Sequence, residues 1–257
     1  MRLSLQKGLS RTMKRTTGIL AGFLLLVGFC STAAAQHSDI EFEYSGSKIV
    51  FENGEFGGTI FESEFPTTGA DQQFTDDPGI ASELAEGLGI NPGDEIYYNI
   101  LGPLEFWDPI AEGFGSLPAG VQIRIENTPP TVPDTIVDAS TVSIPANLTT
   151  GQNRIGEAEP DGDFHGHVDF FLEPLGPTPP VGAYAISMSL LTDAIGIDDS
   201  DPFRIVFNYG LEEEVFEEAV AAFAAPEPST WAMAALALVG LLTRRKWMPR
   251  RSRRTAS

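Results

Sequence analysis

Three histidines and two aspartates form the pattern in this sequence that is best suited to binding a metal ion. His165, His167 and Asp169 alternate in the segment DFHGHVDFFL, and the third histidine opens a similar His37-x-Asp39 pattern. Alternate residues of a β-strand point to one face, so the late triplet would share one side of a strand. Two imidazoles at this spacing can chelate one cation, and imidazoles beside carboxylates suit zinc better than calcium or magnesium. If the first strand pairs near this late strand, three imidazoles and a carboxylate would meet.

Other interpretations of these residues stay open. A solvent-facing strand shows the same alternation without a ligand, since every odd position from Glu157 to Asp169 is a carboxylate or a histidine. Cleavage after Gln36 would make His37 an N-terminal residue, which can chelate copper through its amine. Calcium is an alternative cation, because two turns gather carboxylates as hard oxygen ligands, although neither has the spacing of an EF-hand loop. These carboxylates are Asp161, Asp163, Asp198, Asp199 and Asp201.

Sequence motifs of common active sites are missing. The sequence has no G-x-S-x-G, no H-E-x-x-H and no phosphate-binding glycine loop. Carboxylate pairs are expected by chance in so acidic a chain, so no pair stands out as the acid and base of a glycosidase. The sequence therefore favours a non-enzymatic binding or structural module. The alternative is a metal-dependent hydrolase acting on matrix polymer.

Charge is divided unevenly along the chain. The whole chain has a formal charge of −20, but residues 37–225 hold thirty-five of the thirty-six carboxylates and only four basic residues, which gives about −31. Such a region repels nucleic acid and anionic lipid and attracts cations. Nucleic acid is therefore excluded as a partner, and the charge suits solubility in a salty or calcium-rich exterior. The four basic residues are Lys48, Arg124, Arg154 and Arg204.

Residues 1–35 have the three parts of a secretory signal peptide. Basic residues without any acidic one precede an apolar core from Gly18 to Phe29, and Ala33-x-Ala35 offers a cleavage site before Gln36. The apolar core is too short to span a membrane. Cleavage would remove the only cysteine, so disulfides and cysteine-ligated metals are not expected in the mature chain.

The last segment, residues 226–257, begins with Pro226-Glu227-Pro228. An apolar run from Trp231 to Leu242 follows, and seven basic residues lie beyond it. As a transmembrane helix this run would be only about 18 Å long, against a hydrocarbon core of about 30 Å. The basic tail should stay cytoplasmic, which places the central region outside the membrane.

These three parts, in this order, resemble the PEP-CTERM sorting signal of Gram-negative bacteria. The resemblance implies that an exosortase of the inner membrane recognises and cleaves the segment. It also implies passage through the inner membrane to the cell surface or to an exopolysaccharide matrix. On this basis the mature protein should lack the residues beyond about Pro228.

The central region resembles a loose group of surface-anchored bacterial proteins, some controlled by zinc-responsive repressors. In that group an opening His-x-Asp with a hydrophobic strand is matched by a later H-x-H with an aromatic strand, and then by a G-x-Y strand. Here VGAYAISMSL stands in that last place, and GDEIYYN in the place of the group's Gly-Asp strand. The resemblance lies in short patches between residues 37 and 208 and implies attachment to a surface rather than an activity.

Residues 36–225 are predicted to form one mainly β, antiparallel sandwich-like domain with one or two short helices. A helix is predicted for Asp77–Gly89, because a proline lies near its start and a glycine ends it. A second is predicted for Leu211–Phe223, whose apolar face should close the domain, with partner binding as the alternative. The predicted strands are a hairpin in 39–52, a strand in 57–65 after a turn at Asn53-Gly54, and 94–101, 120–127, 163–172, 182–192 and 202–210.

Overall fold

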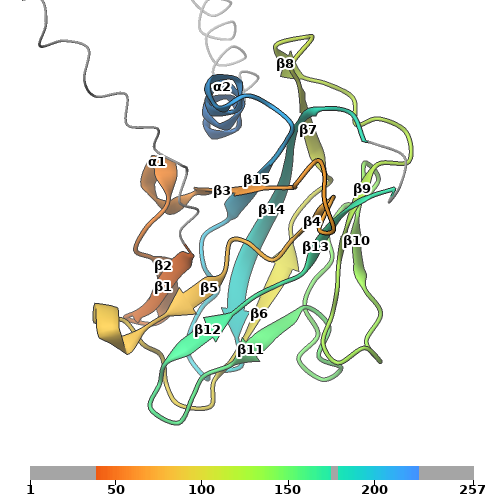
Figure 1. Ribbon diagram of the computed structural model, residues 1–257. Helices are drawn as coiled ribbons and strands as arrows, with labels where there is room; N and C mark the ends of the chain where they lie inside the picture. The colour runs from red at the N-terminus through yellow and green to blue at the C-terminus, as the bar shows by residue number, and fades with distance from the viewer. Residues whose placement is uncertain (1–38, 175–178, 226–257) are drawn as a thin grey trace, which may run out of the picture. The chain divides into compact units, whose positions relative to one another are not determined.

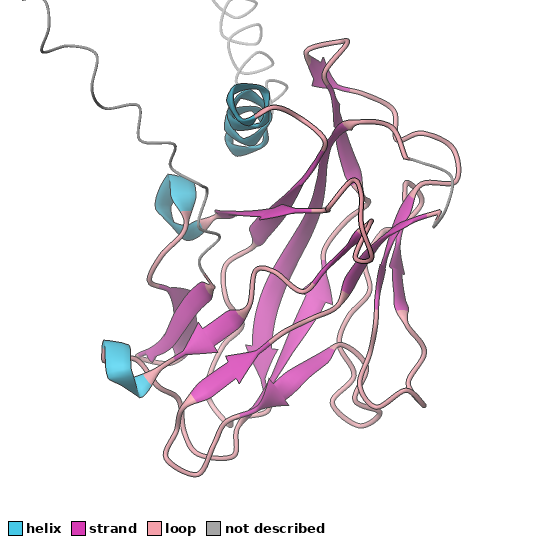
Figure 2. Ribbon diagram, in the orientation of Figure 1, coloured by secondary structure: helices cyan, strands magenta, loops and turns pink. Residues whose placement is uncertain are grey.

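A computed structural model of the chain describes residues 39–174 and 179–225. These residues form two β layers with one long helix outside them, which confirms the predicted mainly β fold with antiparallel sheets (Figures 1 and 2). The signal peptide, His37 and the sorting segment lie outside the described residues. In the described part, no helix has the length and apolar character needed to cross a membrane.

The first layer is a seven-stranded sheet built around the longest strand, β14. Most neighbours in it are antiparallel, but β3 pairs with β15 in parallel. Strands β7 and β8 extend from β14 as a hairpin (Figure 1). The strands are β11 (Arg154–Glu157), β6 (Glu95–Ile100), β14 (Gly182–Thr192), β15 (Phe203–Tyr209), β3 (Ile60–Glu64), β7 (Glu105–Asp108) and β8 (Gly113–Phe114).

The second layer consists of two four-stranded sheets. One has the order β12-β5-β1-β2, in which β1 and β5 are parallel, and the other has the order β10-β9-β13-β4. The strands are β12 (Phe164–Gly166), β5 (Ile80–Ser82), β1 (Ile40–Ser45), β2 (Lys48–Phe51), β10 (Thr135–Val137), β9 (Gln122–Ile125), β13 (Phe170–Glu173) and β4 (Phe74–Thr75).

The hydrophobic core lies between the two layers, because the strands alternate in the side chains they bury. In β14, Tyr184, Ile186, Met188 and Leu190 belong to this core, whereas Ala183 and Ala185 face the other side of the sheet. Aromatic contacts join the layers, and the Phe170 and Phe207 rings have centroids 5.1 Å apart. Apolar burial on this scale is the main stabilising term of such a fold.

Helix α2 (Glu213–Ala224) covers the outer face of the seven-stranded sheet, as predicted for the closing helix. Its buried side chains contact the small residues of β14 and neighbouring apolar groups of the sheet. Glu213 and Glu214 lie in its first turn, where negative charge favours the helix dipole. The buried helix residues are Phe216, Ala219, Val220 and Phe223. The short element α1 (Glu55–Gly58) is a single irregular turn with positive φ angles inside it.

The predicted helix over Asp77–Gly89 is wrong. Residues Ile80–Ser82 instead form β5, which is paired on both sides and completely buried. Backbone hydrogen bonds to two neighbouring strands therefore outweigh the helical signals of the segment. Only Leu84–Glu86 forms one turn of 3-10 helix, which ends at Gly87 in the left-handed conformation.

Two strand predictions also need correction. The segment 163–172 is divided into β12 and β13, and the chain passes between the two sheets of the second layer at residues 167–169. The strand predicted for 57–65 is shorter, Ile60–Glu64, and it joins the other layer beside β15. The Asn53 side chain binds β1: its Nδ2 donates to the Asp39 carbonyl at 2.7 Å, and its Oδ1 accepts from the Glu41 amide at 2.9 Å.

Candidate metal centre at a histidine pair

Strand β5 joins the beginning of the described chain to the histidine segment, because it lies between β1 and β12 (Figure 1). Ile80 of β5 faces Ile40 on one side, and the next residue of β5, Ala81, faces His165 on the other. Asp39 directly precedes Ile40, and Asn53 holds its carbonyl. The first strand and the strand that holds His165 thus belong to one sheet, with β5 between them.

The two imidazoles meet through their Nε2 atoms. Nε2 of His165 lies 3.0 Å from Nε2 of His167 and 3.3 Å from Oδ2 of Asp39. The rings are stacked, with centroids 5.0 Å apart and planes 27° apart. Nε2 of His165 therefore lies close to both the His167 imidazole and the Asp39 carboxylate. The side chain of His165 remains 42% exposed, so a solute can reach this site.

Both imidazoles are held from behind through Nδ1. Nδ1 of His165 lies 3.0 Å from Oε1 of Glu83, and Nδ1 of His167 lies 2.9 Å from the backbone carbonyl of Asp76. A carbonyl and an ionised carboxylate only accept hydrogen bonds, so both Nδ1 atoms act as donors. In a neutral imidazole this assignment leaves the lone pair on Nε2. Glu83 and Asp76 thus fix the tautomers and direct both lone pairs to one place.

Gly79 leaves the space in which these groups meet. A Cβ atom at this position would lie 2.6 Å from Oδ1 of Asp39 and 3.0 Å from Cε1 of His167. Real Cβ atoms essentially never approach other heavy atoms to less than 3.0 Å. Any larger residue here would therefore push the carboxylate or the imidazole out of position.

The remaining predicted ligands stand apart from this contact. Within the described part of the chain, no hydrogen bond or ion pair joins the Asp169 side chain to either histidine. Burial, with the charges of Glu126 and Asp76, raises the pKa of Asp169, whereas His167 lowers it, so Asp169 contributes to the local field. His37 lies outside the described residues, and its role stays a prediction.

Several carboxylates of the calcium alternative have structural partners. Oδ1 of Asp163 accepts the Leu84 amide at 2.7 Å, and Oδ1 of Asp161 accepts the Asp163 amide at 3.2 Å. Asp201 forms an ion pair of 2.7 Å with Lys48. The Asp161 contact is typical of a turn-forming aspartate, which bonds to a nearby backbone amide, whereas Asp163 holds a distant segment and Asp201 pairs with a lysine.

Sequence reasoning missed Glu83, Asp76 and Gly79. Glu83 and Gly79 belong to the segment predicted as a helix, and a helix would not have placed them beside a late strand. The only signal for Asp76 is its backbone carbonyl, which any residue type supplies. The three positions could have been found only by first identifying β5 as a strand.

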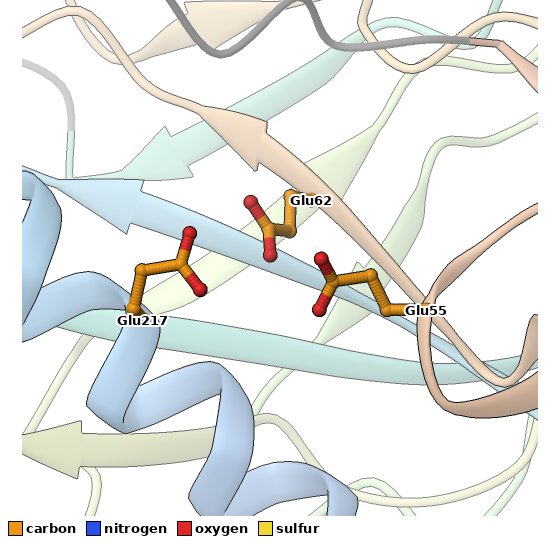
Figure 3. A group of neighbouring side chains, drawn as sticks. All are labelled: Glu55, Glu62 and Glu217. Carbon is orange, nitrogen blue, oxygen red and sulfur yellow. The ribbon is translucent and has the colours of Figure 1, made fainter. Parts of the chain in front are cut away.

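A cluster of three glutamates lies on the outer face of the seven-stranded sheet, where α1, β3 and α2 meet (Figure 3). Glu55, Glu62 and Glu217 each offer an oxygen within 4.8 Å of the others. Burial, together with the charges of Glu217, Glu55 and Glu213, raises the pKa of Glu62 to about 7. Glu62 therefore keeps its proton to higher pH than an ordinary glutamate, and exposed acidic groups are common without a bound ion.

We expect Glu62→Gln to stabilise the protein at pH 8 by about 1 to 3 kcal/mol and to have little effect at pH 4. The pKa of Glu62 in the folded state, about 7, lies above its ordinary value of 4.5. Between about pH 4.5 and pH 7 the folded state therefore binds more protons than the unfolded state does. Stability of the wild type should therefore fall as the pH rises through this range. Urea unfolding at pH 4 and pH 8 measures the difference, with Glu64→Gln, an exposed position of the same strand, as control. Parallel pH profiles for Glu62→Gln and wild type would contradict the prediction.

Comparison with known proteins identifies one segment of the chain. A search of curated proteins found no similar sequence. Residues 224–246 match the family model described as the PEP-CTERM protein-sorting motif. This match confirms the sorting signal that the order of the C-terminal parts predicts, and it leaves the H-x-H resemblance untested. The chain therefore carries a PEP-CTERM sorting signal for exosortase-targeted export to the surface of a Gram-negative cell.

Proposed function

We propose that this protein is a non-enzymatic module of the cell surface or exopolysaccharide matrix that binds a divalent metal, zinc in first place, through His165 and His167. The observation that supports the proposal is the 3.0 Å separation of the two Nε2 atoms. The sorting signal supports the location, because it directs the chain out of the cell. Calcium remains the alternative cation, and a hydrolase acting on matrix polymer remains the alternative activity.

The arrangement of the two rings calls for a cation between them. With both Nδ1 atoms donating to Glu83 and Asp76, two neutral imidazoles would turn their Nε2 lone pairs toward each other at 3.0 Å. A proton or a metal ion between the nitrogens removes this repulsion. The carboxylates of Asp39 and Glu83, 3.3 and 3.0 Å from the ring nitrogens of His165, would balance the charge of a bound metal ion.

The separation of the two Nε2 atoms is close to that of two ligands in a tetrahedral zinc site. Zinc–nitrogen bonds of about 2.0 to 2.1 Å place two ligand atoms about 3.3 Å apart at the tetrahedral angle. The Nε2 atoms need to separate by only a few tenths of an ångström, and Oδ2 of Asp39 already lies 3.3 Å from Nε2 of His165. His165 and His167 would hold the metal, and His37 is the candidate for a third imidazole. Asp39 would have to move toward His167 to supply an oxygen, because the ligand atoms of Asp39, His165 and His167 do not all lie within 4.8 Å of one another. Two nitrogen donors favour zinc over calcium, which prefers six to eight oxygens.

Position in the fold supports binding over catalysis. His165 lies on β12, the edge strand of its sheet, and keeps much of its side chain in solvent. Catalytic sites commonly exclude water around the reacting atoms, which an exposed sheet edge does not do. A bound metal would instead connect β12 to the chain just before β1 and tie the start of the domain to its sheet. Hydrolysis of polysaccharide or ester substrates by the purified protein would favour the enzymatic alternative.

Zinc should raise the melting temperature of the exported protein. A metal present at about 100 times its dissociation constant stabilises the folded state by about 2.7 kcal/mol, provided that it does not bind the unfolded chain. Thermal unfolding after chelator treatment, and again after adding zinc, calcium or magnesium, measures the effect. We expect a shift with zinc that chelator reverses. Equal shifts with all three ions would favour the calcium alternative or unspecific charge screening, and no shift with zinc would overturn the proposal.

A further inference from the structure

A groove of about 650 Å³ lies between the last turn of α2 and the β7–β8 hairpin. Phe106 and Phe114 line it from the hairpin side, and Phe223 and Ala225 line it from the helix side. The Phe114 side chain is unusually accessible for a large apolar residue, with 57% exposed. Its ring packs edge-on against that of Phe223, with centroids 5.0 Å apart. The groove is thus an open, aromatic surface at the end of the helix.

The chain continues from the wall of this groove into the sorting signal. The Ala225 amide still donates to the carbonyls of Ala221 and Ala222, so the chain is anchored to the helix up to that residue. Ala225 itself has φ −66° and ψ 131°, close to the polyproline II conformation. The matched sorting motif begins at residue 224, within the groove wall. The next three residues are Pro226, Glu227 and Pro228.

The groove and this tripeptide have complementary chemistry. Proline-containing segments in the polyproline II conformation dock in grooves lined by aromatic side chains, because little entropy is lost. Arg204, one of the four basic residues between 37 and 225, lines the groove beside its ion-pair partner Glu105 and has further donors that can reach the Glu227 carboxylate. Its Nη1 donates to the Phe223 carbonyl and its Nε to Glu105, both at 3.1 Å. A guanidinium has five donors, so these two contacts leave others to bind a carboxylate.

We propose that the groove holds Pro226-Glu227-Pro228 of the same chain before processing. Three residues reach at most about 11 Å from Ala225, so the tripeptide stays beside the groove whether or not it is bound. A short tether of this kind gives an effective concentration in the millimolar range, and a weak contact is then well populated. Exosortase must withdraw the tripeptide before cleavage. The folded domain therefore shields its own processing site.

Cysteine cross-linking of the full chain tests this docking. In a Cys30→Ser background, Gly115→Cys places a thiol on the groove wall, where a Cβ meets no atom closer than 3.3 Å. Its partner is Ser229→Cys, which follows the tripeptide and leaves Glu227 in place, and the matched control pairs Ser229→Cys with Ile110→Cys at the exposed tip of the same hairpin. We call the double variant with a cysteine at position 115 the groove pair, and the double variant with a cysteine at position 110 the control pair. We expect the disulfide within one chain to form about tenfold faster in the groove pair than in the control pair.

A third variant separates docking from simple proximity. Adding Phe114→Ser to the groove pair removes an aromatic wall, and cross-linking should slow to the rate of the control pair. Equal rates for the groove and control pairs, or no effect of Phe114→Ser, would overturn the proposal. Disulfides between two chains in place of one would assign the groove to a second copy and would also overturn it. If Gly115→Cys does not fold, Ser116→Cys serves the same comparison.

Discussion

Replacing His165 or His167 with alanine should lower the affinity for zinc by more than about 100-fold. Each substitution removes one of the two nitrogen donors, and loss of outer partners alone typically costs about 10- to 100-fold in metal affinity. Zinc titration calorimetry of the exported protein and its variants measures the change. Glu159→Ala removes an exposed carboxylate of the same acidic segment and serves as the matched control for charge.

The other variants sort the remaining residues by role. Asp39→Ala should weaken binding, because Oδ2 of Asp39 lies 3.3 Å from Nε2 of His165. Glu83→Ala should weaken it by about tenfold through loss of ring positioning, whereas Glu83→Gln keeps an acceptor and should bind nearly as the wild type does. If His165→Ala and His167→Ala both bind zinc as the wild type does, the proposed site does not exist. If His37→Ala binds zinc as tightly as the wild type does, His165 and His167 remain the proposed ligands and the third ligand is a group other than His37.

Asp169 and Gly79 give two further comparisons at the same site. Asp169→Ala should change zinc affinity by no more than about threefold. The negative charge of Asp169 acts on the site from a distance, without a hydrogen bond or ion pair to His165 or His167 in the described residues. Gly79→Ala should reduce affinity while leaving all ligands in place, because the added Cβ would collide with Asp39 and His167. A strong loss in Asp169→Ala would restore this residue as a ligand.

Strand periodicity predicted which faces of the chain are buried better than it predicted where strands end. Phe164, Val168 and Phe170 are buried while His165 and His167 are exposed, as the alternation requires, although the strand is broken between them. Alternation reports the side chain's environment and is insensitive to the strand with which the backbone pairs. The change of sheet at residues 167–169 therefore left no trace in the pattern.

Short elements were beyond the reach of local signals. Strands β4, β5, β7, β8, β10 and β11 have two to four residues each and were not predicted, because their pairing depends on partners far away in the sequence. The candidate site suffered from the same limit. The two histidines and Asp39 could be predicted from their spacing and because the sequence has only three histidines. The roles of Glu83 and Gly79 depend on β5, whose three residues resemble the start of a helix.

Phe216→Ala should destabilise the domain by about 3 to 5 kcal/mol, which is typical of a buried phenylalanine. The Phe216 side chain is 2% exposed and packs with Val220 and Phe223 on the outer face of the seven-stranded sheet. Most of α2's stability comes from this apolar face, because a helix of twelve residues is marginal in isolation. Urea unfolding of Phe216→Ala measures the loss, and Glu218→Ala on the exposed face of the helix should stay within about 0.5 kcal/mol of the wild type.

Removing α2 altogether should have a larger effect. The outer face of the sheet would then expose Trp107, Val206 and the alanines of β14 as one apolar patch, and such patches promote aggregation. The sorting signal follows this helix directly, so the chain must keep α2 folded while exosortase handles the residues next to it. A truncated domain that stays soluble and as stable as the wild type would show that α2 is peripheral. That result would favour the alternative in which the helix binds a partner.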